Sequence, residues 1–233
     1  SKRSSTSDFI WIDLRTPLTS IIGYLRLIED RQFKNEDDIL KYTHTAYLKS
    51  IQMKSLVEDL FEYTKVSQSN PHLTINTINV DSMLQQLAAS FELEAKQKHF
   101  VITSQCTPKD LEITGDAEKI GRVFNNLITN ALKYGNGGKN IFLSAKQIND
   151  TVIFEVANDG EKVPAEALGK LFDRFYRVEG SRSKATGGTG LGLAIAQSIV
   201  EMHNGTIEAH SNDKRTSFVI QLPLHQPVSK DLP

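Results

Sequence analysis

A glycine-rich stretch is the part of the sequence whose residue types point most directly to chemistry. It reads Thr186-Gly187-Gly188-Thr189-Gly190-Leu191-Gly192-Leu193 and leads into an apolar-periodic segment that predicts a helix. Glycine lets backbone N–H groups approach a ligand, and the free N–H groups at a helix N-terminus attract phosphate. A P-loop would continue with Lys-Ser/Thr, and a dinucleotide-binding turn would follow a strand; neither is present. The stretch therefore predicts a phosphate site of another architecture, with a flexible loop as the alternative.

A polar helix face is the second candidate. Asn126, Asn130 and Lys133 are spaced by four and three residues, so they share one face of a helix that Asp116 can cap. Mg²⁺ takes one or two protein oxygens and completes its shell with water and substrate phosphates. Two amide oxygens beside an ammonium suit that role. The alternative is an ordinary solvated polar face.

Composition limits the class of protein. The chain has 233 residues, a formal net charge of −1 and a single cysteine, Cys106. The near-zero charge gives no electrostatic basis for nucleic-acid binding, and the lone cysteine suits a reducing compartment. No apolar run is long enough to span a membrane. We expect a soluble, intracellular chain.

The elements that must position these residues fall into two regions. Residues 1–70 predict a helical hairpin, because apolar residues recur every three or four positions over 8–31 and 39–66. Pro17 lies inside the first helix, where a bend is expected. A hairpin this apolar cannot bury its surface alone, so pairing with a second copy into a dimeric four-helix bundle is expected. Packing against the rest of the same chain is the alternative.

Residues 71–233 alternate between strand and helix patterns and predict an α/β sandwich domain. A strand is expected over 73–80, followed by a helix with Asp81 as its cap. Residues 158–189 have little regular pattern, and irregular segments of that length are usually lids or binding loops.

Four segments, taken together, resemble a known family. They are Asn125-Asn126-Leu127-Ile128-Thr129-Asn130-Ala131-Leu132-Lys133-Tyr134, Asn158-Asp159-Gly160, Leu171-Phe172-Asp173-Arg174-Phe175-Tyr176-Arg177 and Gly187 to Leu193. Their order and separation are similar to the N, G1, F and G2 boxes of sensor histidine kinases, whose ATP-binding domain resembles that of gyrase, Hsp90 and MutL. Leu14-Arg15-Thr16-Pro17-Leu18 resembles the family's dimerisation and phosphotransfer hairpin. The sensors partnered with winged-helix regulators, including the vancomycin-resistance sensors, are the most similar.

The resemblance implies ATP and Mg²⁺ as cofactors. Asn130 would be the lead Mg²⁺ ligand with Asn126 beside it. Asn158 stands where much of the family has an Asp that accepts a hydrogen bond from the adenine amino group, and an amide oxygen can still accept it. The other implied nucleotide-binding residues are Lys133, Tyr134, Gly160, Phe172, Arg174, Phe175, Arg177, Gly187, Gly188, Thr189, Gly190, Leu191 and Gly192.

Within that set, the resemblance gives the two phenylalanines the role of anchoring a lid, and Arg174 and Arg177 that of meeting the γ-phosphate. Lys133 and Tyr134 would contact phosphate and nucleoside. Lys162 replaces the second glycine of the G1 box, which weakens the match there.

The first helix departs from the family at the phosphoacceptor: aligned from Arg15-Thr16-Pro17, Ile12 stands at the histidine position, and aligned from Phe9, about three residues are missing. The family reads His-Glu/Asp-Leu-Arg-Thr-Pro, with histidine as phosphoacceptor and the acid as its general base. Here Asp13, Arg15 and Thr16 match and are the implied catalytic residues, but Ile12 occupies the histidine position. Isoleucine has no nucleophilic atom. An engineered change, a loss of about three residues and a naturally degenerate sensor all remain open as explanations.

The sequence therefore predicts the ATP-binding core of a sensor histidine kinase with autophosphorylation absent or impaired. In the family, phosphate passes to the histidine and then to an aspartate on a response regulator. A non-catalytic dimeric module that binds or dephosphorylates a response regulator is the alternative. Contact with a membrane is expected only through parts outside this chain, which would be the cytoplasmic portion of a bacterial sensor.

Overall fold

The structure, a computed structural model, describes residues 6–66, 73–178 and 188–226. Contacts divide these residues into two compact units. The helical unit extends to Thr64, with Gly188 and Thr189 grouped with it, and the α/β unit contains the rest. The predicted domain boundary between residues 70 and 71 lies outside the described residues.

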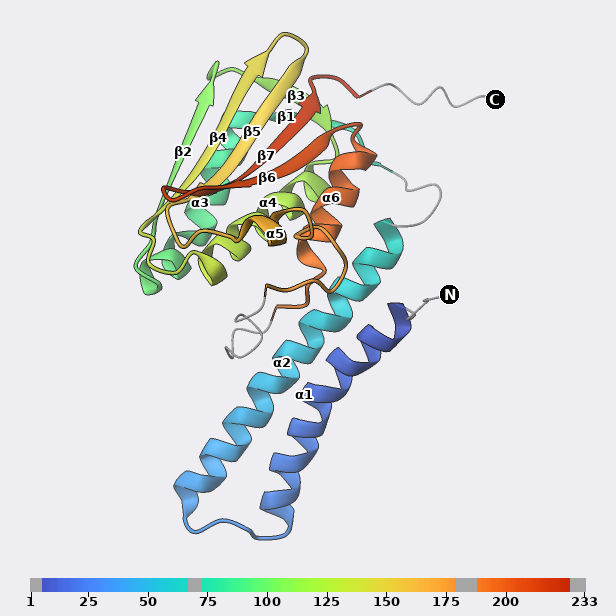
Figure 1. The fold of residues 1–233 in the computed structure, drawn as a ribbon, viewed down its shortest axis with the longest axis vertical. Coiled ribbons are helices and arrows are strands. Elements are labelled where there is room, and N and C mark those ends of the chain that lie inside the picture. The colour runs from blue at the N-terminus through green and yellow to red at the C-terminus, as the bar shows by residue number, and fades with distance from the viewer. Residues whose placement is uncertain (1–5, 67–72, 179–187, 227–233) are drawn as a thin grey trace, which may run out of the picture. The chain divides into compact units, whose positions relative to one another are not determined.

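The helical unit is the predicted hairpin. It consists of α1 (Thr6–Glu29) and α2 (Glu36–Val66), which run side by side in opposite directions (Figure 1). The start of α2 is capped, because the Asp38 N–H donates to Asn35 Oδ1 at 3.0 Å and the Lys34 N–H donates to Asp38 Oδ2 at 2.9 Å. α1 continues through Pro17. Large apolar side chains remain exposed in the single hairpin: Trp11, Leu18, Ile22, Leu25, Leu40, Tyr47, Leu48, Ile51 and Phe61.

The α/β unit is built around a five-stranded sheet. Its elements are β1 (Asn76–Asn79), α3 (Val80–Gln97), β2 (Val101–Thr107), β3 (Glu112–Gly115), α4 (Ala117–Tyr134), β4 (Asn140–Ile148), β5 (Thr151–Asn158), α5 (Ala165–Leu168), α6 (Gly192–Met202), β6 (Thr206–Ser211) and β7 (Thr216–Pro223). The sheet order is β2-β4-β5-β7-β6, with β2 and β4 parallel and the other pairs antiparallel. β1 and β3 form a separate antiparallel pair.

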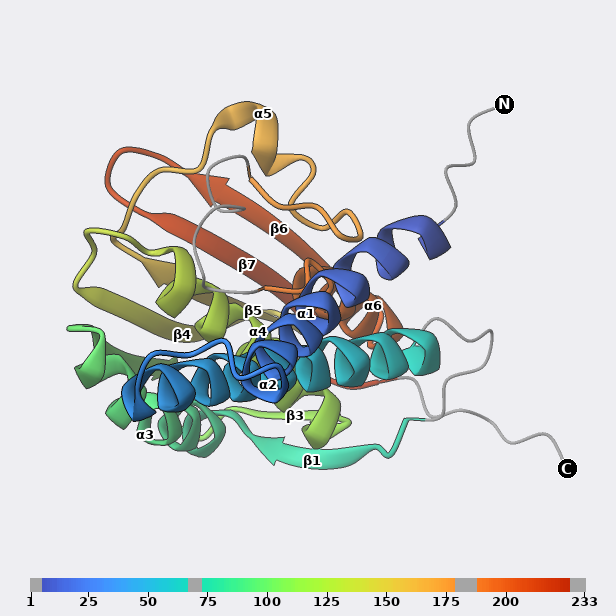
Figure 2. The same cartoon turned by 90° about the horizontal axis from the view of Figure 1, so that it is seen from below.

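The core lies between this sheet and helices α3, α4 and α6, which cover one of its faces (Figures 1 and 2). Along β5 every second residue faces the helices and is buried, as Val152, Phe154 and Val156 show. The ring of Phe124 on α4 packs edge-on against Phe154 with centroids 5.4 Å apart. The predicted α/β sandwich is thus confirmed.

One predicted helix cap is correct and one is wrong. Asp116 caps α4, since its Oδ1 accepts from the Lys119 N–H at 3.1 Å. α3 begins earlier than expected: Asn79 is its cap and accepts from the Ser82 N–H at 2.9 Å. Asp81 instead lies in the first turn, where it pairs with Lys109 at 2.8 Å. The strand expected over 73–80 is correspondingly limited to Asn76–Asn79.

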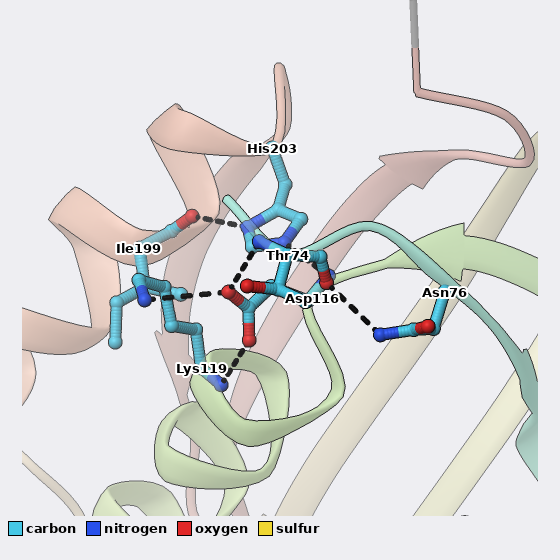
Figure 3. Close-up of polar contacts among 6 residues, drawn as sticks. All are labelled: Thr74, Asn76, Asp116, Lys119, Ile199 and His203. Atoms are coloured by element: carbon cyan, nitrogen blue, oxygen red, sulfur yellow. Dashed lines mark hydrogen bonds and ion pairs between the residues drawn. The ribbon is translucent and has the colours of Figure 1, made fainter. Parts of the chain in front are cut away.

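A buried histidine network braces the end of α6 against the start of α4 (Figure 3). His203 is fully buried, and its Nε2 accepts from the backbone N–H of Asp116 at 3.0 Å. Its Nδ1 lies 2.8 Å from the Ile199 carbonyl oxygen, so Nδ1 carries the proton and the ring is neutral. The Asp116 carboxylate also accepts from the Thr74 N–H at 3.0 Å. Three segments distant in sequence are joined here.

This network predicts acid sensitivity of the α/β unit. Burial lowers the pKa of His203, and the Ile199 carbonyl and Asp116 offset this only in part. Between the folded and the unfolded pKa, His203 is protonated in the unfolded chain and neutral in the folded chain. The contribution of neutral His203 to the free energy of unfolding is therefore fully present above about pH 6.5 and is lost as the pH falls towards the folded pKa. We expect denaturant titrations to show a smaller loss in unfolding free energy between about pH 7.5 and 5.5 for His203→Gln than for the unmodified chain.

The exposed histidine His210 provides the control. A His210→Gln variant should keep the full acid loss of the unmodified chain. An equal loss in both variants would mean that His203 is not the group responsible.

Candidate functional site

The polar face predicted on α4 exists. Asn126, Asn130 and Lys133 are each half-buried along the helix, and Tyr134 ends it. The opposite positions, among them Val123 and Leu127, are buried in the core. The helix thus holds its amide side chains on a rigid support. Their role as Mg²⁺ ligands stays a prediction.

Asn126 joins this face to the N-terminus of α6. Its Nδ2 donates to the Gly192 carbonyl oxygen at 2.9 Å, which leaves Oδ1 as the atom able to meet a cation. α6 begins at Gly192, and its cap residue Leu191 makes no side-chain capping bond. The N–H groups at the start of α6 therefore lie beside the amide side chain of Asn126. This is an arrangement suited to a phosphate with its metal ion.

The backbone just before α6 requires glycine at position 190. It has φ +69°, and a Cβ there would lie 2.7 Å from Phe175 Cα. The Phe175 N–H donates to the Gly190 carbonyl oxygen at 2.9 Å. Of the remaining predicted glycine-stretch residues, Gly188 and Thr189 group with the helical unit, and Gly187 lies outside the described residues.

The two phenylalanines are both fixed to the α/β unit. The Phe172 ring packs edge-on against Phe218 of β7 with centroids 6.2 Å apart, and Phe175 is held by its backbone bond to Gly190. Arg174 is exposed and Arg177 is half-buried in the same segment. The lid and γ-phosphate roles of these residues stay predictions.

Asn158 occupies the last helix-facing position of β5. It continues the buried series of Phe154 and Val156, and only 5 % of the residue is exposed. Its Nδ2 lies against Gly135, where a Cβ would approach it to 2.9 Å. The side chain therefore lies at the C-terminal end of α4, close to Tyr134.

Asp159 and Gly160, which follow β5, are fixed by contacts with the backbone between Gly135 and Asn140. Asp159 Oδ1 accepts from the N–H groups of Lys139 at 2.7 Å and Asn140 at 2.8 Å. Burial would raise the pKa of Asp159, but hydrogen bonds from Asn140 and Lys139 outweigh it and hold the pKa below its usual value. A Cβ on Gly160 would lie 2.5 Å from the Gly135 carbonyl carbon. Asp159 and Gly160 thus shape the segment, and the sequence did not single out Gly135.

The implied catalytic residues lie together on α1. Asp13 is half-buried, whereas Arg15 and Thr16 are exposed. Ile12 directly precedes Asp13 in the same helix, and no residue of α1 is a histidine. Within the described ranges, no three His, Cys, Asp or Glu side chains gather as a metal site.

Comparison with known families decides the identity of the chain. Residues 115–226 match the model described as histidine kinase-, DNA gyrase B-, and HSP90-like ATPase. Residues 12–69 match the His Kinase A (phospho-acceptor) domain. The chain belongs to the sensor histidine kinases. The match to the phospho-acceptor domain begins at Ile12. The match to the ATPase family supports the expectation that ATP is the cofactor.

Curated sensor kinases resemble this histidine kinase over nearly its whole length. It is 39% identical to sensor protein VanS of Enterococcus faecium over 213 residues, which are 91% of the chain and 54% of VanS. It is 34% identical to sensor protein kinase WalK of Staphylococcus aureus over 215 residues, 91% of the chain and 51% of WalK. The chain spans about half the length of these relatives.

Solved histidine kinases share the fold. Histidine kinase AdeS of Acinetobacter baumannii is 25% identical with a TM-score of 0.72, covering 91% of this chain and 96% of AdeS. ThkA, solved in complex with response regulator protein TrrA, is 20% identical with a TM-score of 0.77, covering 95% of this chain and 62% of ThkA. The predicted family and fold class are confirmed. None of the described helices of this histidine kinase has the length and apolar character needed to cross a membrane.

Proposed function

We propose that the α/β unit binds ATP with Mg²⁺ as the nucleotide-binding half of a protein-histidine kinase. The observation that carries the proposal is the hydrogen bond from Asn126 to Gly192, which joins the amide face of α4 to the N-terminus of α6. An amide oxygen that can bind a metal ion lies at this junction beside the N–H groups at the start of α6, which can bind phosphate oxygens. Neither feature alone would distinguish this site from a polar surface.

The site residues would divide the work of holding the nucleotide. Asn130 and Asn126 would hold the metal ion through Oδ1, and the ion would supply positive charge to neutralise the phosphates. Gly190 and Gly192 bring backbone N–H groups to the phosphates, while Lys133, Arg174 and Arg177 add positive charge. Phosphoryl transfer depends on positioning and charge stabilisation, which fixed donors on a helix provide.

The acceptor half is incomplete. Asp13 would act as general base towards a neighbouring histidine, but Ile12 offers no nucleophilic atom. We therefore propose that this chain binds nucleotide without autophosphorylation on α1. The second candidate function is a non-catalytic module that binds or dephosphorylates a response regulator. It is favoured by Ile12, because a module of this kind does not need a phosphoacceptor. A regulator phosphatase assay with and without nucleotide separates the two.

The exposed apolar side chains of α1 and α2, such as Ile22, Leu25 and Leu48, support a homodimer in which two hairpins form a four-helix bundle. A response-regulator receiver domain is the proposed partner of that bundle. The parent protein is proposed to be a membrane sensor with this chain on its cytoplasmic side.

Nucleotide binding tests the proposal directly. An Asn130→Ala variant should bind ATP about tenfold or more weakly in the presence of Mg²⁺, since polar contacts to charged groups contribute about 1.5–3 kcal/mol. Isothermal titration calorimetry of the whole chain measures this.

Asn125→Ala is the matched control, because Asn125 is an equally half-buried neighbour on α4 that carries no proposed contact. Its affinity should match that of the unmodified chain. Equal affinities for all three proteins, or no binding by the unmodified chain, would contradict the assignment.

A further inference from the structure

Phe175 has a backbone conformation that bulky residues rarely adopt. Its φ is +61°, in the left-handed region where the Cβ of an ordinary residue crowds the carbonyl oxygen that follows. Two contacts hold the segment there. The Phe175 N–H donates to the Gly190 carbonyl oxygen at 2.9 Å, and the Phe172 ring packs against Phe218. Strained residues persist where their surroundings impose the conformation, and they gather at functional sites.

The contact with Phe175 also fixes the peptide group that leads into α6. A Cβ on Gly190 would lie 2.7 Å from Phe175 Cα and 2.8 Å from its carbonyl carbon, so the two backbones are in direct contact. A trans peptide group is planar, so the bond to the Gly190 oxygen also directs the Leu191 N–H, which points away from Phe175. Leu191 is the cap residue of α6, and its side chain is buried. The peptide group between Gly190 and Leu191 is thus held at both ends.

We infer that Phe175 is a positioning residue of the nucleotide site and that it acts through its main chain. Its N–H holds the peptide group between Gly190 and Leu191 in the orientation in which the start of α6 can meet phosphate. The inference rests on the proposed function, in which phosphates bind at the start of α6. It differs from the lid-anchoring role that the resemblance gives the ring, because it requires the left-handed backbone and not the aromatic side chain.

The two roles predict opposite orders among substitutions of Phe175. A role of the ring would favour apolar replacements, so Phe175→Val would be tolerated better than Phe175→Asn. A role of the main chain favours residues that accept a positive φ. Asparagine does so, whereas the branched Cβ of valine is among the side chains least compatible with that region. Phe175→Val is therefore expected to leave the left-handed region and turn its N–H away from Gly190.

Calorimetric titration of the whole chain with ADP and Mg²⁺ tests the inference. Phe175→Asn should bind ADP about fivefold or more tightly than Phe175→Val, because it keeps the peptide group before α6 oriented. Amide hydrogen exchange should show the same order, with faster exchange over residues 172–178 in Phe175→Val.

Two controls use related substitutions elsewhere in the α/β unit. Asn149 has φ +53° in the exposed turn between β4 and β5, so Asn149→Val should lose stability in urea unfolding and leave the ADP affinity unchanged. Phe172 is held through its ring, so the order should reverse there: Phe172→Val should resist urea better than Phe172→Asn.

Tighter ADP binding by Phe175→Val than by Phe175→Asn would assign the role to the ring and overturn the inference. Equal ADP affinities of the two folded variants would make Phe175 a residue of the fold alone, and would overturn it as well. If Phe175→Val does not fold, Phe175→Leu takes its place, because leucine is apolar and also lacks the tolerance of asparagine for positive φ. Absence of ADP binding by the unmodified chain would overturn the proposed function, whereas either order among the variants leaves it standing.

Discussion

Replacing Ile12 with histidine is expected to give the chain acid-labile phosphate from ATP, which the unmodified chain does not acquire. The change creates His-Asp-Leu-Arg-Thr-Pro on α1, with Asp13 directly after the new imidazole. An imidazole nitrogen is a nucleophile and an isoleucine side chain is not, so the difference is between no transfer and some transfer. Incubation with γ-labelled ATP, followed by acid and alkaline washes, measures it.

The controls separate acceptor chemistry from effects on folding. Ile12→Gln introduces a polar side chain of comparable size without an imidazole and should remain unlabelled. Asn130→Ala combined with Ile12→His should lose the label, because the proposed nucleotide site is weakened. Equal acid-labile label in the unmodified chain and in Ile12→His would show that another residue accepts the phosphate.

Local signals in the sequence predicted much of the fold. The alternation of polar and buried positions along α4 follows from its 3.6-residue period, so the sequence alone places Asn126 and Asn130 on one face. Asp116 is predictable as a cap because capping depends only on nearby residues. The misplaced cap of α3 shows the limit of such signals. Asn79 and Asp81 are both good capping types, and pairing of Asn79 with Glu112 fixes where the strand ends.

Contacts between distant segments could not be predicted in this way. Asn126 was expected as a metal ligand, and nothing local shows that its NH₂ donates to Gly192, 66 positions later. The His203 network likewise depends on Asp116, 87 positions earlier. Three glycines lie between residues 135 and 138, but nothing local shows that the partner of Gly135 is Gly160.

That close approach makes Gly160→Ala the substitution with the largest expected effect on stability. The added Cβ would lie 2.5 Å from the Gly135 carbonyl carbon and 2.6 Å from its Cα and oxygen. All three are backbone atoms, so no flexible side chain can yield. Overpacking of this kind costs about 1–3 kcal/mol. We expect that loss in urea unfolding of the α/β unit, together with weaker ATP binding, because any shift moves Asn158.

Gly121→Ala is the matched control, with the opposite expected sign. Gly121 lies inside α4, and a Cβ there meets nothing within 4 Å. Alanine in a helix interior is more favourable than glycine by about 0.5–1 kcal/mol, because glycine loses more backbone freedom on folding. The two substitutions make the same chemical change in one domain. Destabilisation by Gly160→Ala beside stabilisation by Gly121→Ala is therefore the result expected from the close contact with Gly135. Similar effects of both would place the segment after β5 further from α4 than the structure does.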